Sequence, residues 1–266
     1  MTPAPPRYAE LAPPPALARW VASVWELRGM ADAGGERHRV LPDGCIDLMF
    51  TPDRPSATQL VGPMSTAIEV PLEGEVDVLG LRLRPGGHVL LGAVDARSLV
   101  DLLVEPAAEG TLLRDRALAL ARGIETRPSL AERASRIWAA LLPLAASAPP
   151  PDPLLEHALR RWSREPATVR ELVRDSGYSE RTLERRFLAA AGFRPAELRR
   201  LARFRVVLRL HAAGEPRWAA LAATAGYADQ AHLTREFRRF AGVSPSAWAT
   251  EQADVGIVQD GRVAAL

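Results

Sequence analysis

The sequence predicts an α+β chain of two domains, in which a mainly β domain precedes an all-helical one. Up to about residue 95, short apolar runs alternate with turn residues, which is typical of a sandwich or a barrel. Beyond that point, apolar residues recur every three or four positions, as in amphipathic helices. Four prolines within residues 149–153 separate the two parts, because proline removes an amide donor and disfavours helix.

The first part contains strand patterns and then helix patterns. Leucines at every second position of residues 79–83 have the period of a half-buried strand. Turns are expected at Pro42–Gly44 and Arg84–Gly87. Strands are expected at Val21–Leu27, Arg37–Leu41, Cys45–Phe50, Gln59–Gly62, Ala67–Pro71 and Val78–Leu83. Residues 96–144 predict two amphipathic helices that either cover the sheet or mediate dimerisation.

The second part predicts helices throughout. Thr168 and Ser179 suit N-cap positions, and Asp229 suits a helix start, where its charge complements the helix dipole. The helices are expected near residues 153–164, 168–175, 180–190, 195–212, 217–224, 229–240 and 245–250.

Two stretches of this part, Leu172–Pro195 and Leu221–Pro245, repeat each other. Each one reads as a helix, a Gly-Tyr turn, a second helix and a Gly-x-x-Pro stop. This is the pattern of a helix-turn-helix, which lays its second helix in the major groove of DNA. A plain helical bundle with solvated arginines is the alternative, and two matching units in register argue against it.

The second helix of each unit has an apolar face and a polar face. Leu183 and Phe187, and likewise Leu233 and Phe237, are four residues apart and pack inward. Arg, Gln and Glu side chains can read bases through hydrogen bonds, and Ala can contact a thymine methyl. The outward faces carry Glu180, Arg181, Glu184 and Arg185 in the first unit, and Gln230, Ala231, His232, Thr234 and Arg235 in the second.

The helix expected between the two units has a suitable length for two successive groove segments. Residues 195–212 would span about 27 Å at 1.5 Å per residue. Successive major-groove segments on one DNA face lie about 34 Å apart. Bending of the DNA, at a cost on the order of 1–6 kcal/mol, would accommodate the difference.

Charge and composition agree with a nucleic-acid partner. The net charge is +2, but residues 154–248 hold 18 Arg against 10 Asp and Glu, so positive charge is concentrated on the repeat. A single cysteine fits a reducing cytosol, which predicts a cytoplasmic protein. Residues 1–15 lack the pattern of a signal peptide, and no apolar run is long enough for a membrane span, so no membrane association is expected.

Residues 154–250 resemble the DNA-binding domain of the AraC/XylS-type bacterial transcriptional regulators. The resemblance is carried by Gly226-Tyr227, Leu233, Phe237, Gly242-Val-Ser-Pro245 and Trp248. It implies base reading by Arg181, Glu184 and Arg185 in the first unit and by Gln230, Ala231, His232 and Arg235 in the second. It implies phosphate contacts by Ser179, Arg186, Arg194 and Arg238. Glu180 and Glu184 put negative charge on the second helix of the first unit, which would repel phosphate unless Glu184 meets a base donor or pairs with Arg181. The first unit is therefore expected to be a selective but weak reader of DNA.

Residues 20–105 resemble an N-terminal domain that is often fused to such regulators. The likeness is carried by residues 20–25, 39–48, 61–64 and 80–86, and the usual arrangement in the family is a cupin-like β-barrel that senses a small molecule. Candidates to line a ligand pocket are Trp20, Trp25, His38, Met49 and Arg82, although ordinary core aromatics are the alternative for the tryptophans.

Other chemistry has little support in the N-terminal part. His38, Cys45 and His88 lack the spacing of a metal site, and no metal or cofactor is expected. No nucleophile elbow or phosphate loop occurs, so no catalytic residue and no enzyme activity are expected. Asp43 is expected to cap a turn, and Asp47 to pair with Arg82 or Arg84.

The sequence therefore predicts a DNA-binding transcription regulator that responds to a small-molecule effector. The alternative is a ligand-independent DNA-binding protein whose N-terminal domain only dimerises. Expected partners are double-stranded DNA and an unknown effector, with RNA polymerase and a second copy of the chain as further partners considered. Expected boundaries are 1–145 for the sensory or dimerisation domain, 146–153 for a semi-rigid linker, 154–250 for the DNA-binding domain and 251–266 for a tail that is flexible or docks as a strand.

Overall fold

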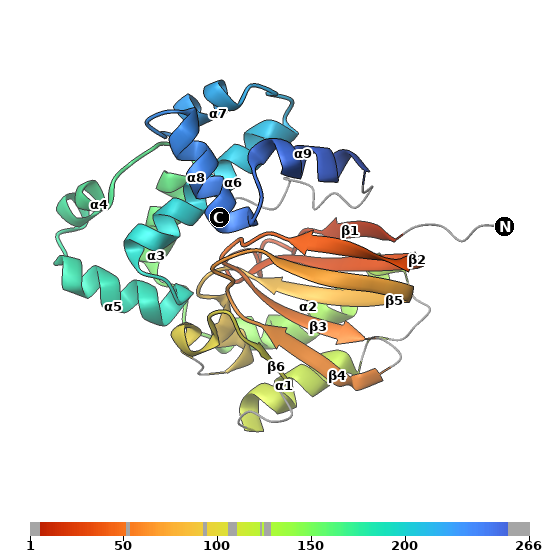
Figure 1. Ribbon diagram of the computed structural model, residues 1–266. Helices are drawn as coiled ribbons and strands as arrows, with labels where there is room; N and C mark the ends of the chain where they lie inside the picture. Colours follow the sequence, from red (N-terminus) through yellow and green to blue (C-terminus); the bar gives the residue numbers. More distant parts are fainter. Residues whose placement is uncertain are drawn as a thin grey trace.

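The computed structural model describes residues 6–51, 54–92, 95–105, 111–122, 124 and 129–254 (Figure 1). The strands are β1 (Arg7–Leu11), β2 (Val21–Val40), β3 (Ile46–Thr51), β4 (Arg54–Val61), β5 (Ile68–Leu83) and β6 (Leu103–Val104). The 3-10 helices η1 (Gly87–Leu91) and η2 (Ala96–Leu99) and the helices α1 (Thr111–Ala121) and α2 (Leu130–Ser147) belong to the same part of the chain. The helical part consists of α3 (Pro153–Trp162), α4 (Val169–Ser176), α5 (Glu180–Ala191), α6 (Pro195–Ala212), α7 (Trp218–Thr224), α8 (Gln230–Ala241) and α9 (Pro245–Asp254).

The strands form one antiparallel sheet in the order β1-β2-β5-β3-β4-β6. Val40 at the end of β2 pairs with Ile68, whereas Ile46 at the start of β3 pairs with Leu83. Ile68 and Leu83 are 15 residues apart, or about 50 Å on a straight strand, but the six steps from Val40 to Ile46 span at most about 22 Å. The ribbon of β2 and β5 therefore folds back on itself, and a register shift after Ala31 adds curvature.

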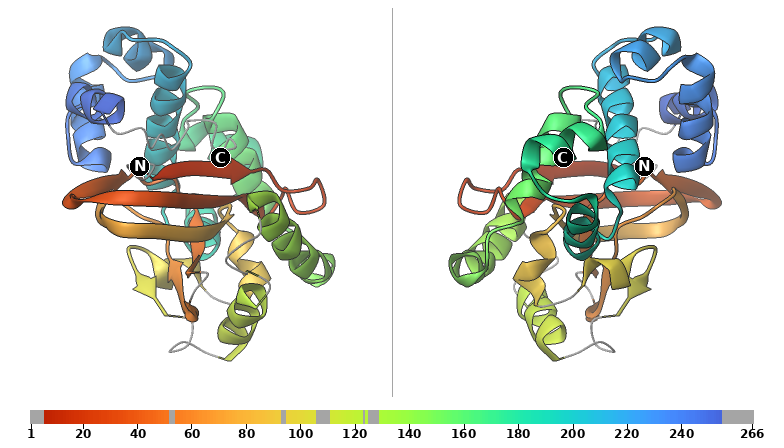
Figure 2. Two further views of the ribbon diagram at one scale, coloured as in Figure 1. Left: turned by 90° about the vertical axis from the view of Figure 1, so that its right-hand side faces the viewer. Right: turned by 90° about the vertical axis from the view of Figure 1, so that its left-hand side faces the viewer.

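The two faces of the sheet pack against different partners. The concave face encloses a small core that is formed by Trp25, Leu27, Ala31, Leu72 and Val76. The other face presents Leu48, Leu79 and Leu81, which pack with α1 and α2 in a larger core. Figure 2 shows the helical part on one side of the strands and α1 on the opposite side. The sheet therefore lies between two layers of helices.

The linker lies against the first domain. The indole nitrogen of Trp20 donates a hydrogen bond to the carbonyl of Pro149 over 3.2 Å, and Pro151 is buried. A Cβ atom on Gly86 would lie only 3.4 Å from the Pro151 Cβ. The linker is thus held against the first domain at Pro149 and Pro151, just before α3 begins.

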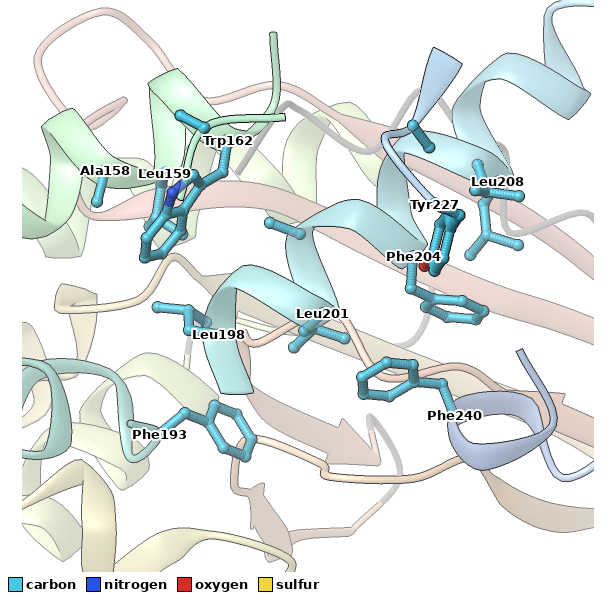
Figure 3. Packing of buried hydrophobic residues seen from close by; sticks show 14 of the residues in the cluster. Ala158, Leu159, Trp162, Phe193, Leu198, Leu201, Phe204, Leu208, Tyr227 and Phe240 are labelled. Atoms are coloured by element: carbon cyan, nitrogen blue, oxygen red, sulfur yellow. The ribbon is translucent and has the colours of Figure 1, made fainter. Parts of the chain in front are cut away.

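The helical part has one core, which is centred on α6. Leu198, Leu201, Phe204 and Leu208 from α6 are buried (Figure 3). The ring of Phe204 lies 5.1 Å from the rings of both Phe237 and Phe240 of α8. The first unit joins the same core through Leu172, Leu183 and Phe187, and Trp162 of α3 lies 5.9 Å from Phe187. Both units therefore pack on one helix.

The α+β prediction with a β-rich N-terminal part and a C-terminal helical part is confirmed. The helices after residue 152 begin and end within a few residues of their predicted limits. The expected strands 21–27 and 37–41 form one strand, β2, and 67–71 and 78–83 form one strand, β5. Among the described residues the sheet is open and folded over rather than closed, because β1 and β6 pair on one side only. Residues 255–266 of the expected tail lie outside the described residues.

We expect Phe204→Ala to lower the free energy of unfolding by about 3–5 kcal/mol, because it leaves a cavity where α6 packs against α8. Denaturant-induced unfolding monitored by circular dichroism measures this. Leu142→Ala on α2, where the side chain is 41% exposed, is the control and should change stability by less than about 0.5 kcal/mol. Equal losses for the two variants would contradict the central role of Phe204.

Candidate nucleic-acid interface

The first helix-turn-helix consists of α4 and α5, and local interactions determine its limits. Thr168 and Glu171 form a capping box at the start of α4, as expected for this N-cap. Gly177 ends α4 with a φ of 70°, a left-handed conformation that glycine adopts without steric cost. Ser179 caps α5 by accepting a hydrogen bond from the amide of Thr182 over 3.3 Å. The turn between the two helices is therefore encoded locally.

The second helix-turn-helix consists of α7 and α8 and has the same plan. Asp229 caps α8 by accepting a hydrogen bond from the amide of His232 over 2.6 Å. Gly226 occupies the left-handed turn with a φ of 73°, and Tyr227 beside it is buried. The side chain of Asp229 therefore performs the role expected from the sequence.

The expected spacer helix is α6, and it joins the two units rigidly. Its limits, Pro195–Ala212, match the expected range. The ring of His211 near its end stacks on Trp218 at 4.8 Å and lies 5.6 Å from Trp248. α5 therefore precedes the start of α6, while α7 packs against its end.

The outward faces of α5 and α8 carry exposed arginines. Arg181 and Arg185 lie four residues apart on α5, opposite the buried Leu183. Gln230, Ala231 and Arg235 are exposed on α8, as is Arg238, while His232 is half-buried. Within the described parts of the chain, Arg181, Arg185, Arg235 and Arg238 form no ion pair. Their guanidinium groups are thus available to a polyanion.

Other residues expected to contact DNA already have partners. Glu184 pairs with Arg194 over 3.2 Å, and an ion pair with Arg181, one of the two expected alternatives, is not found among the described residues; a base donor as partner stays a prediction. Arg194 lies close enough to offset the negative charge of Glu184 on α5. The offset is only partial, because the pair is exposed to solvent. Ser179 is occupied as a helix cap, and its hydroxyl lies 2.9 Å from that of Thr182.

Arg186 is held inside the domain. Its guanidinium donates hydrogen bonds of 2.7 and 2.6 Å to both carboxylate oxygens of Asp152, the N-cap of α3, and stacks 4.8 Å from the ring of Tyr178. Burial raises the pKa of Asp152, but hydrogen bonds from Arg186 and from the amide of Leu154 outweigh burial and hold the pKa below its usual value. Arg186 therefore links the first reader to the end of the linker, and its expected phosphate contact stays a prediction.

Three of the five residues expected to line a ligand pocket lie together on the concave face of the sheet. Trp25 and Met49 both flank Gly80 in the strand register, where a Cβ atom would overlap the Trp25 ring. Arg82 lies two residues further along β5, with its guanidinium 5.8 Å from the Trp25 ring. His38 is also buried, and burial lowers its pKa, so its neutral form is favoured.

The charge of Arg82 is neutralised within the fold, as the sequence indicated. Asp47 accepts hydrogen bonds from Nε and Nη2 of Arg82, each over 3.0 Å, and also from the indole nitrogen of Trp25. Asp43 lies 3.4 Å from the same guanidinium and accepts a hydrogen bond from the amide of Cys45 over 2.9 Å, as expected for a turn cap. Arg82 is thus a structural cation that orients Trp25 and Asp47.

Trp20 does not join this group. Its ring belongs to the core between the sheet and α1 and α2, and its indole nitrogen bonds to the linker. The sequence also gave no role to Arg39, whose side chain bonds to Glu251 and to the carbonyl of Ala241. Its only signal was a cation within segment 39–48, because Ala241 and Glu251 lie more than 200 residues away in the sequence.

A helix with the length and apolar character of a membrane span is not found in the described part of the chain.

Two family models match parts of the chain. The family model described as "Helix-turn-helix domain" matches residues 172–251, and a "Domain of unknown function (DUF6597)" matches residues 9–105. A search of the curated proteins finds no match. The C-terminal domain is therefore a helix-turn-helix of the AraC type, which supports DNA binding by this part of the chain.

Solved structures of ToxT from Vibrio cholerae are similar to the chain over nearly its whole length. One covers 94% of this chain and 98% of its own, with 10% sequence identity and a TM-score of 0.43. Another, bound to (E)-4-(8-methylnaphthalen-1-yl)but-3-enoic acid, covers 94% of this chain and 99% of its own, with 11% identity and a TM-score of 0.44.

Two adjacent arginines on α5, Arg185 and Arg186, should differ in how much they contribute to the stability of the fold. We expect Arg186→Ala to lower the free energy of unfolding by about 1–3 kcal/mol, because it removes two charged hydrogen bonds from a half-buried pair. Arg185→Ala is the control, since its side chain is exposed and should leave stability within about 0.5 kcal/mol. Chemical denaturation at pH 7 compares the two.

The loss in Arg186→Ala should also depend on pH. Because the folded pKa of Asp152 is lowered, its contribution to stability is present above about pH 4 and is lost as protonation removes the pair at lower pH. Unfolding curves of the wild type and Arg186→Ala should therefore converge at acid pH. A constant difference down to pH 2 would contradict the role of Asp152.

Proposed function

We propose that this regulator reads two successive major-groove segments through α5 and α8 and changes its DNA binding when a small molecule occupies the N-terminal domain. The observation that supports DNA reading most directly is the pair of recognition helices on one rigid helix, each with exposed, unpaired arginines among the described residues. The helix α6 separates the two places of positive charge; its 18 residues span about 27 Å, somewhat less than the groove repeat of about 34 Å.

The residues of α8 suggest a division of work. Arg235 lies on the side of α8 opposite Leu233 and Phe237, where a bidentate bond to guanine is available. The exposed Gln230 and Ala231 lie at the first turn, where a recognition helix contacts base edges. Arg238 lies one turn further along and is assigned to phosphate. The amide of Ala228 is 3.5 Å from Nδ1 of His232, which favours a donor hydrogen on Nε2.

The first reader depends on Arg181 and Arg185. These two side chains share one exposed face, and Glu184 between them is partly neutralised by Arg194. A carboxylate at this position accepts a hydrogen bond from cytosine but repels phosphate. We assign Arg181 and Arg185 to guanine and Glu184 to cytosine, so the first reader contributes selectivity more than affinity.

The effector proposal rests on the folded sheet. Trp25, Met49 and His38 are brought to the concave side, where aromatic and apolar side chains surround a polar group formed by Asp47 and Arg82. Because Asp47 already neutralises Arg82, this interior favours a largely apolar molecule with a hydrogen-bonding group over a simple anion.

A homodimeric, ligand-independent DNA-binding protein is the second candidate, and exposed leucines favour it. Leu102 and Leu103 at the sheet edge are 47% and 55% exposed, and Leu112 on α1 is 49% exposed. Exposed apolar side chains on an edge strand and a nearby helix are typical of an association surface. In this alternative the N-terminal domain contributes only a dimer contact.

Selection of bound sequences from a random DNA library tests DNA reading. We expect Arg235→Ala to weaken binding of the selected sequence by about 1–3 kcal/mol and to relax preference at one base position. Arg238→Ala should weaken all sequences alike and reduce the salt dependence of binding, because it removes one phosphate contact. Arg114→Ala, which removes an exposed arginine from α1, is the control and should leave binding unchanged. Uniform weakening by Arg235→Ala would contradict its base-reading role.

A thermal-shift screen of small molecules against the full chain tests the effector. We expect a ligand present at about 100 times its Kd to stabilise the chain by about 2.7 kcal/mol and to change the affinity for the selected DNA. Met49→Ala on the concave face should reduce that shift, whereas Leu112→Ala should not. Light scattering in the absence of ligand distinguishes the alternative, because dimerisation that is lost in Leu103→Arg without any ligand response favours a dimerisation-only domain.

A further inference from the structure

The N-terminal domain holds the C-terminal end of α8. Nη1 of Arg39 donates a 3.0 Å hydrogen bond to the carbonyl of Ala241, the last residue of α8. The amide of Ala67 donates a 2.7 Å hydrogen bond to the carbonyl of Phe240. Both donors occupy carbonyls that a helix leaves unpaired at its end, and the Arg39 charge complements the negative end of the helix dipole.

Arg39 also ties this end of α8 to α9. Its Nε lies 3.0 Å from a carboxylate oxygen of Glu251, and its Nη2 lies 2.7 Å from Glu69 on β5. Only 14% of its side chain is exposed. A largely shielded guanidinium with three partners has a fixed direction, because its planar arrangement of donors fits few other positions.

The same domain also holds the C-terminal end of α5. Gly192, which ends α5 with a φ of 77°, lies against η2 so closely that a Cβ atom would be 2.6 Å from Val100 and 2.9 Å from the carbonyl of Ala96. Figure 1 shows α5 and α8 each ending toward the strands. The glycine of each Gly-x-x-Pro stop therefore faces the N-terminal domain, because Gly242 lies beside Arg39.

A third contact involves the spacer helix between the two readers. Leu41, at the end of β2, is buried in the core of the helical domain. Burial lowers the pKa of Arg205 on α6, while the neighbouring carboxylate of Asp43 opposes this. The turn after β2 thus packs beside α6 at a position between the two helix ends.

The helix α6 sets the distance between the two units, and supports at both of its ends and beside it restrain the relative rotation of the units as well. We propose that the N-terminal domain is a clamp, formed by Arg39, Ala67 and η2, that fixes the angle between α5 and α8 and so determines which separation of the two DNA half-sites is bound. This inference rests on the proposed reading of DNA by both helices. Arg39 is a positioning residue in it, because it touches the reader but not the bases.

The test uses the full chain and the selected DNA sequence with base pairs inserted or removed between the two half-sites. Each base pair rotates one half-site by about one tenth of a turn relative to the other. The wild type should bind one separation best. In Arg39→Gln we expect the preference for that separation over one with two inserted base pairs to fall about three- to tenfold, a typical effect of a coupling residue. Base preferences within each half-site should stay unchanged.

Arg37→Gln is the matched control. Arg37 lies two residues earlier on the same strand, pairs with the same Glu69, and has a side chain that is 72% exposed. It should leave the separation profile as in the wild type. A purely structural role for Arg39 would lower thermal stability without broadening the profile.

A second pair of variants tests the contact with α5 independently. Gly192→Ala forces a side chain into η2, whereas Gly74→Ala on β5 introduces similar backbone strain at a φ of 64° with no atom within 4 Å. We expect Gly192→Ala alone to shift or broaden the preferred separation. This arm decides the matter if Arg39→Gln proves too unstable to assay.

The outcomes separate the two proposals. Failure of the wild type to select any DNA would overturn the proposed reading and the clamp together. Selection of DNA by the wild type, with the same separation profile in Arg39→Gln, Gly192→Ala and the controls, would overturn the clamp alone.

Discussion

The structure depends on the burial of one face of α6. Leu198, Leu201, Phe204 and Leu208 form the floor on which both helix-turn-helix units pack. A short unit of two helices cannot bury its apolar face alone, and α4 has only 8 residues. Sharing one long helix solves this for both units and fixes their separation at the length of that helix. The packing on α6 that stabilises the domain therefore also sets the spacing of the two recognition helices.

The arginines of the helical domain divide into two groups according to burial. Arg186 and Arg200 are partly shielded and carry bidentate hydrogen bonds to Asp152 and Glu236. Arg181 and Arg185 extend into solvent and form no ion pair among the described residues. A partner must be released before a paired arginine can bind phosphate, which removes most of the gain. Net charge thus overstates the cationic surface available to DNA, and the exposed, unpaired residues define it better.

Local chemistry made the helical domain predictable. Thr168, Ser179 and Asp229 cap their helices through side chains that act within three residues, so sequence alone determines where α4, α5 and α8 begin. The N-terminal sheet was less predictable. Over part of β5 the alternation of apolar and polar residues is lost, and many side chains there are exposed. Backbone pairing with β2 keeps the strand continuous through this part. The curvature that brings Trp25 to the concave side follows from strand register, which a single sequence does not specify.

The contacts between the domains were the hardest to predict, since Arg39 and Glu251 are 212 residues apart. No periodicity connects such residues, and each one alone reads as a solvated charge. The contacts between the domains nevertheless orient the helices that they hold. If the N-terminal domain restrains α5 and α8, binding of DNA at one separation must in turn favour one arrangement of the segments around residues 39, 67 and 96–100, because coupling between sites is reciprocal. An effector that displaces these segments would therefore alter the preferred DNA geometry before it alters any base contact.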